Sequence, residues 1–149
     1  MRLLGGVNMG GGIPGWVKAI LRWPVTLPAA RFALASAFLL GGILKLADFP
    51  GAVAEQAHFG LQPAAAWAVM AILVEIIGPL LLIVGRYVWI AAGALGVLTA
   101  IAAVVATPFW ALEGAERIAA ANGFFERCGL IAGLILVARL AADETDARA

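Results

Sequence analysis

The sequence predicts an all-α protein, a transmembrane four-helix bundle. Of its 149 residues, 64% are hydrophobic and only 13% are charged, whereas soluble domains carry about a quarter charged residues. The apolar residues gather in long runs, and a helix that spans a membrane needs about 20 of them in succession. The length suits a single domain, and no linker rich in serine, proline or charge divides it.

Four apolar segments are long enough to span a membrane, and turn-forming or polar residues bound each of them. Pro28 and Pro63 suit helix starts, because proline is tolerated in the first turn. Gly85 suits the end of the second helix, and Pro108 stops the third. We therefore expect spans at 27–46, 63–84, 87–107 and 123–142.

The residues before the first span combine aromatic and basic side chains. Trp16 and Trp23 flank Lys18 and Arg22, which suits a short N-terminal helix lying in the membrane interface. The alternative is a juxtamembrane end of the first span, and the sequence leaves both open. The predicted organisation is a cytoplasmic leader, a membrane domain and a polar C-terminal tail, at 1–26, 27–142 and 143–149.

Lysine and arginine are distributed unevenly among the predicted loops. Seven lie in the loops and span ends on the side of the two termini, and three lie in the loops and span ends on the opposite side. Because cytoplasmic loops carry the excess of positive charge, we expect both termini in the cytoplasm and loops 47–62 and 108–122 outside. The predicted location is the bacterial inner membrane.

Glu75 lies near the middle of the apolar run 64–84. A carboxylate in hydrocarbon costs at least a few kcal/mol unless it is buried among partners, so an intramembrane acid is a functional candidate. Small residues spaced four and three apart put Glu75 on a stripe suited to close helix packing. The stripe consists of Ala64, Ala68, Ala71, Glu75, Gly78, Leu82 and Gly85.

Small-residue stripes in the other spans lead toward further polar residues. These stripes are Ala33, Ala37, Gly41 and Lys45 in the first span, Ala92, Gly96, Ala100 and Ala103 leading toward Thr107 in the third, and Glu126, Gly129 and Gly133 in the fourth. We expect Lys45, Glu75 and Glu126 to face one polar cavity in the outer half of the bundle. Lys45 would meet Glu126 directly and Glu75 through a water or a shared ligand. Arg127, about 100° round the helix from Glu126, would reach the outer surface.

Each of the three charged residues also has a structural interpretation. Lys45 suits a lysine that extends to the interface from a helix end. Glu126 suits a residue favoured by the dipole at a helix start. Glu75 suits a neutral, hydrogen-bonded structural acid. The sequence leaves these alternatives open.

Several classes of function lack the residues they need. A net charge of +1 and the absence of a basic run exclude nucleic-acid binding. Cys128 is the only cysteine, so no internal disulfide or dithiol forms, and its role is not indicated. His58 is the only histidine and has no partners at metal-ligand spacing, so no metal site is expected. No signature of a flavin, haem or nucleotide site is present.

Two segments resemble the DoxX family of small four-span membrane proteins. They are Phe38-Leu-Leu-Gly-Gly-Ile-Leu-Lys-Leu-Ala-Asp-Phe-Pro50 and Ile72-Leu-Val-Glu-Ile-Ile-Gly-Pro-Leu-Leu-Leu-Ile-Val-Gly85. Phe109-Trp110 and the segment 124–136 are similar to later signatures of that family. The resemblance covers about Arg31 to Arg139 and implies the four-span fold.

The resemblance implies a looser set of functional expectations. Some members are linked to thiosulfate oxidation with quinone reduction, or to membrane oxidoreductase complexes that handle thiol and oxidative stress, and many have no assigned activity. The family's lysine and glutamate carry over to Lys45 and Glu75, and its acidic position in the last span carries over to Glu126. These three are the candidate catalytic residues. Thr107 stands where members often have a histidine, which argues against a histidine-dependent reaction. Thr107 and Trp110 join Lys45 and Glu75 as candidates for binding a cofactor such as quinone.

The sequence therefore predicts a redox accessory or quinone-interacting subunit in the lipid bilayer, working with a partner oxidoreductase that supplies electrons. The first alternative is a non-catalytic scaffold or assembly factor whose buried charges fix helix register. The second is a small transporter with a polar path. Whether the chain is itself catalytic, whether it forms a homo-oligomer, and the identity of the substrate and electron donor stay open.

Overall fold

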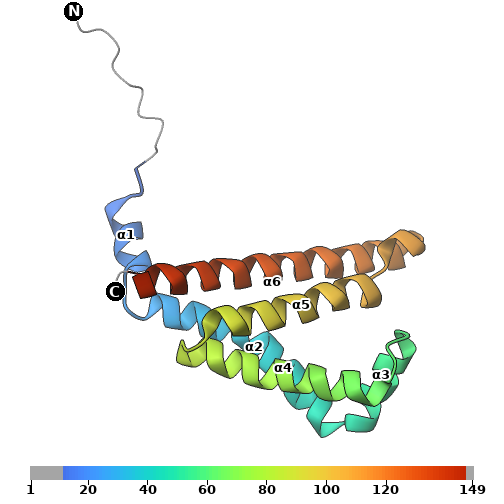
Figure 1. The fold of residues 1–149 in the computed structure, drawn as a ribbon. Helices are drawn as coiled ribbons and strands as arrows, with labels where there is room; N and C mark the ends of the chain where they lie inside the picture. The colour runs from blue at the N-terminus through green and yellow to red at the C-terminus, as the bar shows by residue number, and fades with distance from the viewer. Residues whose placement is uncertain (1–11, 147–149) are drawn as a thin grey trace, which may run out of the picture.

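The structure, a computed structural model, describes residues 12–146, and their regular elements are all helical (Figure 1). The all-α prediction is confirmed. In chain order the elements are α1 Gly15–Leu21, α2 Thr26–Ala47, α3 Phe49–His58, α4 Ala64–Val84, α5 Val88–Ala106, the 3-10 helix η1 Phe109–Ala111, and α6 Gly114–Asp146.

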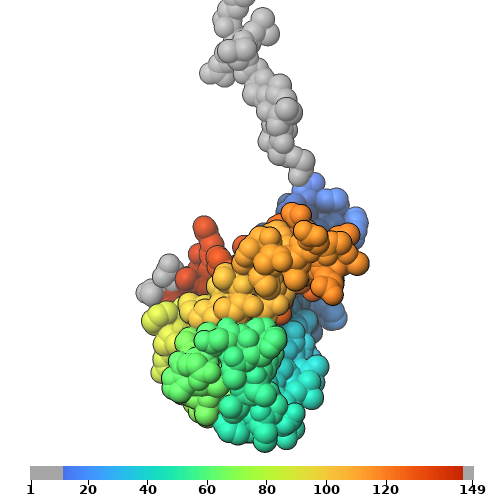
Figure 2. All heavy atoms as spheres, turned by 90° about the vertical axis from the view of Figure 1, so that its right-hand side faces the viewer, coloured from blue at the N-terminus to red at the C-terminus, as the bar shows by residue number. Residues whose placement is uncertain are grey.

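The four long helices run antiparallel as a bundle, with α2 packed mainly on α4 and α5 mainly on α6 (Figure 1). The start of α2 and the end of α6 lie together, and we call this the termini end. The α3 end is opposite and carries α3, η1 and the start of α6. Figure 2 looks onto the α3 end, where the green atoms around α3 lie beneath the orange atoms around the start of α6.

Three helical stretches in the described residues are long and apolar enough to cross a membrane, Thr26–Ala47, Ala64–Val84 and Val88–Ala111. Large apolar side chains on the outside of the bundle are exposed, among them Leu40, Val97 and Leu136. Such a surface suits lipid, because soluble proteins rarely expose large contiguous apolar areas. The chain is a multi-pass membrane protein. α6 runs beside α5, and charged residues interrupt its apolar part.

The predicted bounds of the first three spans are correct to within about a residue. Gly85 has a φ of 76°, a left-handed conformation that ends α4 and that glycine adopts without a Cβ clash. The segment predicted only as the loop 47–62 contains α3. Asp48 caps α3, since its Oδ1 accepts a hydrogen bond from Gly51 N at 3.0 Å. The Asp-Phe-Pro-Gly sequence thus ends one helix and starts the next.

The helix that contains the predicted fourth span is longer than that span, because α6 begins at Gly114, and the start of the span at Gly123 stays a prediction. The intervening residues include several alanines, which favour a helix, so the helix extends toward η1. Before the first span, α1 forms a short helix, and a turn at Arg22–Val25 separates it from α2. This separation favours a distinct N-terminal helix over an extension of the first span.

Helix packing matches the predicted stripe on α4, where five small or apolar positions are buried: Ala64, Ala68, Ala71, Gly78 and Leu82. A Cβ at Gly78 would lie 2.9 Å from Leu95 Cγ, so glycine allows α5 to approach closely. Leu82, Leu95 and Leu134 are among the largest fully buried side chains and fill the bundle from three helices.

The predicted stripes on α5 and α6 are only partly correct. Gly96 and Gly129 have no neighbouring atom within 4 Å of a Cβ position, whereas a Cβ at Gly133 would lie 3.5 Å from Leu34 Cδ1. On α5 the packed face includes Leu95 and Thr99. Ala92 and Ala103 of the predicted α5 stripe are also buried on this face, whereas Gly96 is not in close contact.

Candidate functional site: a charged cavity at the α3 end

Two glycines bring α2 against the middle of α4. A Cβ at Gly42 would lie 2.9 Å from Ile76 Cγ1 and 3.0 Å from the carbonyl carbon of Glu75. A Cβ at Gly41 would lie 3.4 Å from Glu75 Oε2. The absence of side chains at these positions lets the backbones approach. The last turn of α2 therefore lies directly beside the glutamate.

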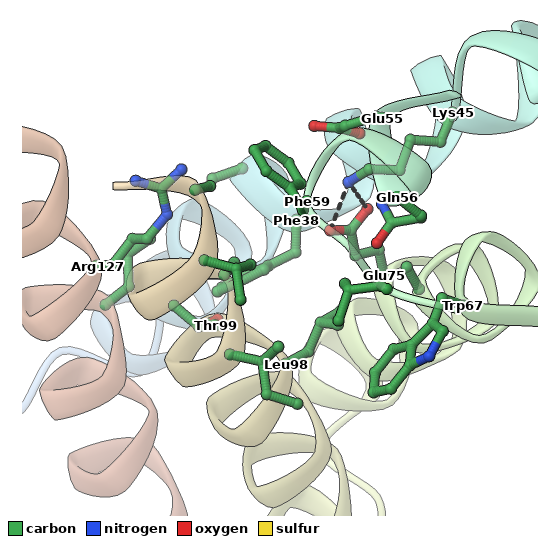
Figure 3. A pocket seen from close by; sticks show the side chains of 18 residues that line it. Phe38, Lys45, Glu55, Gln56, Phe59, Trp67, Glu75, Leu98, Thr99 and Arg127 are labelled. Atoms are coloured by element: carbon green, nitrogen blue, oxygen red, sulfur yellow. Dashed lines mark hydrogen bonds and ion pairs between the residues drawn. The ribbon is translucent and has the colours of Figure 1, made fainter. Parts of the chain in front are cut away.

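Lys45 and Glu75 form a direct ion pair (Figure 3). Lys45 Nζ donates to both carboxylate oxygens, at 2.8 Å to Oε1 and 2.7 Å to Oε2. The Lys45 side chain is 23% exposed and that of Glu75 is 13% exposed. These fractions leave the pair partly accessible, so a small molecule beside it can reach the charged atoms.

The direct contact corrects the expectation that a water or a ligand would join Lys45 to Glu75. Glu75 lies roughly 16 Å along α4 from its start at Ala64, whereas Lys45 is in the last turn of α2. Because α2 ends level with the middle of α4, the two side chains meet. α3 then continues from α2 and packs along α4.

A cavity of about 290 Å³ adjoins the ion pair. It lies between the α2–α4 pair and the α5–α6 pair, and α3 supplies part of its wall (Figure 3). Its lining is mostly apolar and aromatic, with Phe38, Phe59, Trp67, Leu98 and Leu130 among the larger side chains. Concave apolar sites with a few convergent polar groups are typical of small-molecule binding.

Six polar side chains also line the cavity: Lys45, Glu55, Gln56, Glu75, Thr99 and Arg127. Thr99 Oγ1 donates to the carbonyl oxygen of Leu95 at 2.6 Å, so its donor is already used within α5. Arg127 Nη1 donates to the carbonyl oxygen of Gly123 at 3.2 Å. That contact uses one of five N–H groups in the guanidinium.

The predicted positions of Glu126 and Arg127 are wrong. Glu126 is exposed and does not line the cavity, whereas Arg127 lines it from α6 (Figure 3). Adjacent helical residues differ by a rotation of about 100°, as expected, but α6 is turned so that Arg127, and not Glu126, faces the cavity. The role predicted for Glu126 therefore lacks support from this cavity.

Thr107 and Trp110, predicted to help bind a cofactor, do not line the cavity either. Thr107 is buried, and its Oγ1 donates to the carbonyl oxygen of Ala103 at 2.6 Å. Trp110 is mostly exposed and packs in an aromatic cluster in which Phe109 and Phe124 have ring centroids 5.3 Å apart. Phe109 and Trp110 of η1 thus pack against Phe124 of α6, which gives the Phe-Trp element a structural role.

Lys45 and Glu75 are therefore the sequence-predicted site residues that the structure brings together. Gln56 and Phe59 were missed because the segment that contains them was predicted only as a loop. A sequence signal for α3 was present in Asp48 and Pro50, an N-cap residue followed by a proline suited to the first turn.

The arrangement offers both a proton donor and a proton acceptor beside an apolar cavity. A lysine ammonium donates hydrogen bonds, and a carboxylate accepts them or takes up a proton. A paired charge in a low-dielectric site contributes little net stability, because desolvation offsets the attraction. Such a pair is more informative as a candidate functional site than as a stabilising contact.

No curated protein and no solved structure matches the chain. The family model of DoxX matches residues 26–108, which is more than half of the 149 residues. The match runs from the first residue of α2 to the residue before η1 and includes both members of the ion pair. The similarity noted for Phe109-Trp110 and for α6 lies beyond it and stays a prediction. The chain belongs to the DoxX family of membrane proteins.

Proposed function

We propose that the protein is a quinone-interacting subunit that works with a partner oxidoreductase. The observation that carries the proposal is the Lys45–Glu75 ion pair in the wall of an apolar cavity. The pair would hold the polar ring of a lipid-soluble molecule, and the cavity walls would cover its apolar faces.

The charge balance of the cavity supports a neutral ligand. Lys45 and Arg127 contribute two positive charges to its lining, and Glu55 and Glu75 contribute two negative charges. A ligand with a single charge would add a charge that no side chain of the lining compensates, which is unfavourable in a site of low dielectric. A quinone is uncharged and presents carbonyl oxygens that suit donors such as lysine and arginine.

The cavity volume of about 290 Å³ lies at the lower limit for small-molecule sites. It suits the ring of a quinone, while an attached hydrocarbon chain would lie in the surrounding lipid. Phe38, Phe59 and Trp67 would cover the ring faces, since aromatic side chains prefer offset or edge-on contact with another ring.

Reduction of a quinone to a quinol takes two electrons and two protons, one proton on each oxygen. In this proposal the partner oxidoreductase supplies both electrons. Lys45 would hydrogen-bond a ring oxygen, and Glu75 would pass it a proton after taking one up. The second proton would reach the other oxygen from water. The same groups would take protons back if the quinol were oxidised.

Equilibrium binding of decyl-ubiquinone to the purified protein in lipid nanodiscs tests the proposal. We expect saturable binding to the wild type. Binding to the double variant Lys45→Met/Glu75→Gln should be about tenfold weaker, because a favourable hydrogen bond to the ligand is lost. The double variant removes both charges together and leaves neither unpaired. Absence of saturable binding to the wild type, or equal binding by the double variant, would contradict the proposal.

The orientation in the membrane is a second part of the proposal. We expect both termini to face the cytoplasm of a bacterial cell and α3 to lie toward the outside, because seven of the ten lysines and arginines fall on the side of the termini. Arg2 and Arg148, which contribute to this count, lie outside the described residues. The test is to place a cysteine near the N-terminus or the C-terminus of the chain and to add a membrane-impermeant thiol reagent to intact cells. Labelling of either cysteine from outside the cell would contradict the orientation.

A further inference from the structure

Gln56 is a buried polar residue of the cavity, and its side-chain amide has no hydrogen-bond partner among the described residues. It lies on α3, is 8% exposed and lines the cavity beside the Lys45–Glu75 pair (Figure 3). Among residues 12–145, no side-chain hydrogen bond joins its amide to another residue, and the amide atoms keep contact with the open cavity, since the one fully buried side-chain nitrogen or oxygen without a partner there is Arg31 Nε. Its backbone oxygen is used separately, accepting from Leu61 N at 3.0 Å.

Because the amide has no hydrogen-bond partner in the described part of the protein and opens onto the cavity, it loses hydrogen bonds on folding unless a water or a ligand in the cavity replaces them. A leucine of similar size would fill the same space without that loss. The neighbouring groups do not satisfy the amide. Lys45 uses two of its three N–H groups on Glu75, and Thr99 donates within its own helix.

The geometry points to Gln56 as the residue that recognises the polar ring of the ligand. This inference rests on the proposed quinone function and adds the group that selects the ligand. The N–H groups of the amide donate to a quinone carbonyl, and its oxygen accepts from a quinol hydroxyl once the amide has turned over. Gln56 therefore serves the oxidised and the reduced form of the same molecule.

A neutral amide has an advantage over a charged residue at this position. A lysine would lack an acceptor for the quinol, and a carboxylate would lack a donor for the quinone. Because α3 carries Gln56 against the cavity and Phe59 follows directly at its C-terminal end, this segment supplies a polar and an apolar contact to the same ligand. α3 is thus the recognition element, while α2 and α4 supply the groups that handle protons.

Comparison of Gln56→Leu with Gln62→Leu tests the inference. Gln62 is exposed and does not line the cavity, so the second variant controls for loss of a glutamine. Binding of decyl-ubiquinone and of decyl-ubiquinol is measured in nanodiscs at equal lipid content. We expect Gln56→Leu to weaken the binding of both forms about tenfold, and Gln62→Leu to leave both unchanged.

Thermal unfolding without ligand separates recognition from a structural role. Because the amide has no protein partner, we expect the melting temperature of Gln56→Leu to equal or exceed that of the wild type. A lower melting temperature with unchanged binding would assign Gln56 to structure and overturn the inference. Unchanged binding of both forms by Gln56→Leu, with weakened binding by Lys45→Met/Glu75→Gln, would overturn the inference while the proposed function stood. If the wild type binds neither decyl-ubiquinone nor decyl-ubiquinol, the proposed function and the inference about Gln56 are both contradicted.

Discussion

The two ends of the bundle each hold an ion pair between helices, but the pairs lie in different surroundings. At the termini end Arg31 Nη2 lies 3.4 Å from Glu144 Oε2, and the Arg31 side chain is 10% exposed whereas that of Glu144 is 43% exposed. At the α3 end Lys45 and Glu75 lie closer, are both largely covered, and face a cavity. The termini-end pair links the start of α2 to the end of α6, whereas the α3-end pair adjoins space for a ligand.

The difference shows why distance and burial have to be considered together. An ion pair with an exposed member is screened by solvent and contributes little to stability. A covered pair loses hydration, and it persists only where both members satisfy each other. The glycines of α2 make such satisfaction possible at the α3 end, because they allow Lys45 to reach Glu75. The combination of covered charge and adjoining space makes the α3 end the candidate functional end.

The largest effect should come from closing the α2–α4 contact. Gly42→Leu places a side chain where even a Cβ would lie 3.0 Å from the Glu75 backbone. We expect a loss of about 3 kcal/mol in the free energy of unfolding, because the backbones have to separate. Gly93→Leu is the matched control, since no atom lies within 4 Å of its Cβ position. Similar melting temperatures for the two variants in detergent would refute the close contact.

A smaller loss should follow from breaking the covered ion pair. Lys45→Met leaves Glu75 without its partner, and we expect a loss of about 2 kcal/mol in the free energy of unfolding, less than for a fully buried pair because both side chains stay partly accessible. Addition of Glu75→Gln should restore most of it, since the unpaired charge is removed. A double-mutant cycle measures the coupling, and additive effects of the two substitutions would show that the pair is not coupled.

The smallest effect should come from the pair at the termini end. Glu144→Gln removes a partly exposed carboxylate at 3.4 Å from Arg31, and we expect a loss of less than about 1 kcal/mol. Chemical denaturation of this variant beside Lys45→Met measures the contrast directly. A loss as large as that of Lys45→Met would remove the distinction between the two ends.

The fold was largely predictable from the sequence because the bilayer imposes a simple rule on helix length and composition. The small-residue stripe on α4 and the identities of Lys45 and Glu75 also follow from helical spacing. The contact between them does not, since it depends on where α2 ends relative to α4. Arg127 was assigned to the wrong face for a related reason, because helical spacing fixes the angle between neighbours and leaves the rotation of the helix undetermined.

The contribution of α3 could not be predicted from apolar periodicity. Its ten residues are too few to span a membrane, so the length of apolar runs alone leaves them in the loop 47–62. The burial of Gln56 arises only when α3 packs along α4. Tertiary packing therefore determines which polar residue faces the cavity, and the sequence alone determines only which ones are available.

The central claim is that the α3 end contains an accessible, mostly apolar cavity beside the Lys45–Glu75 pair, while the termini half of the bundle is closely packed. Cysteine accessibility tests it directly, in a Cys128→Ser background because Cys128 is exposed. Ala102→Cys introduces a thiol on the cavity wall of α5, and Ala92→Cys introduces one on the packed face of the same helix.

A small methanethiosulfonate reagent reports where water reaches, since the reactive form is the thiolate. We predict that Ala102→Cys reacts, that decyl-ubiquinone slows its reaction, and that Ala92→Cys stays unreactive while the protein is folded. Equal reaction rates at the two positions, or an unreactive Ala102→Cys, would contradict the account.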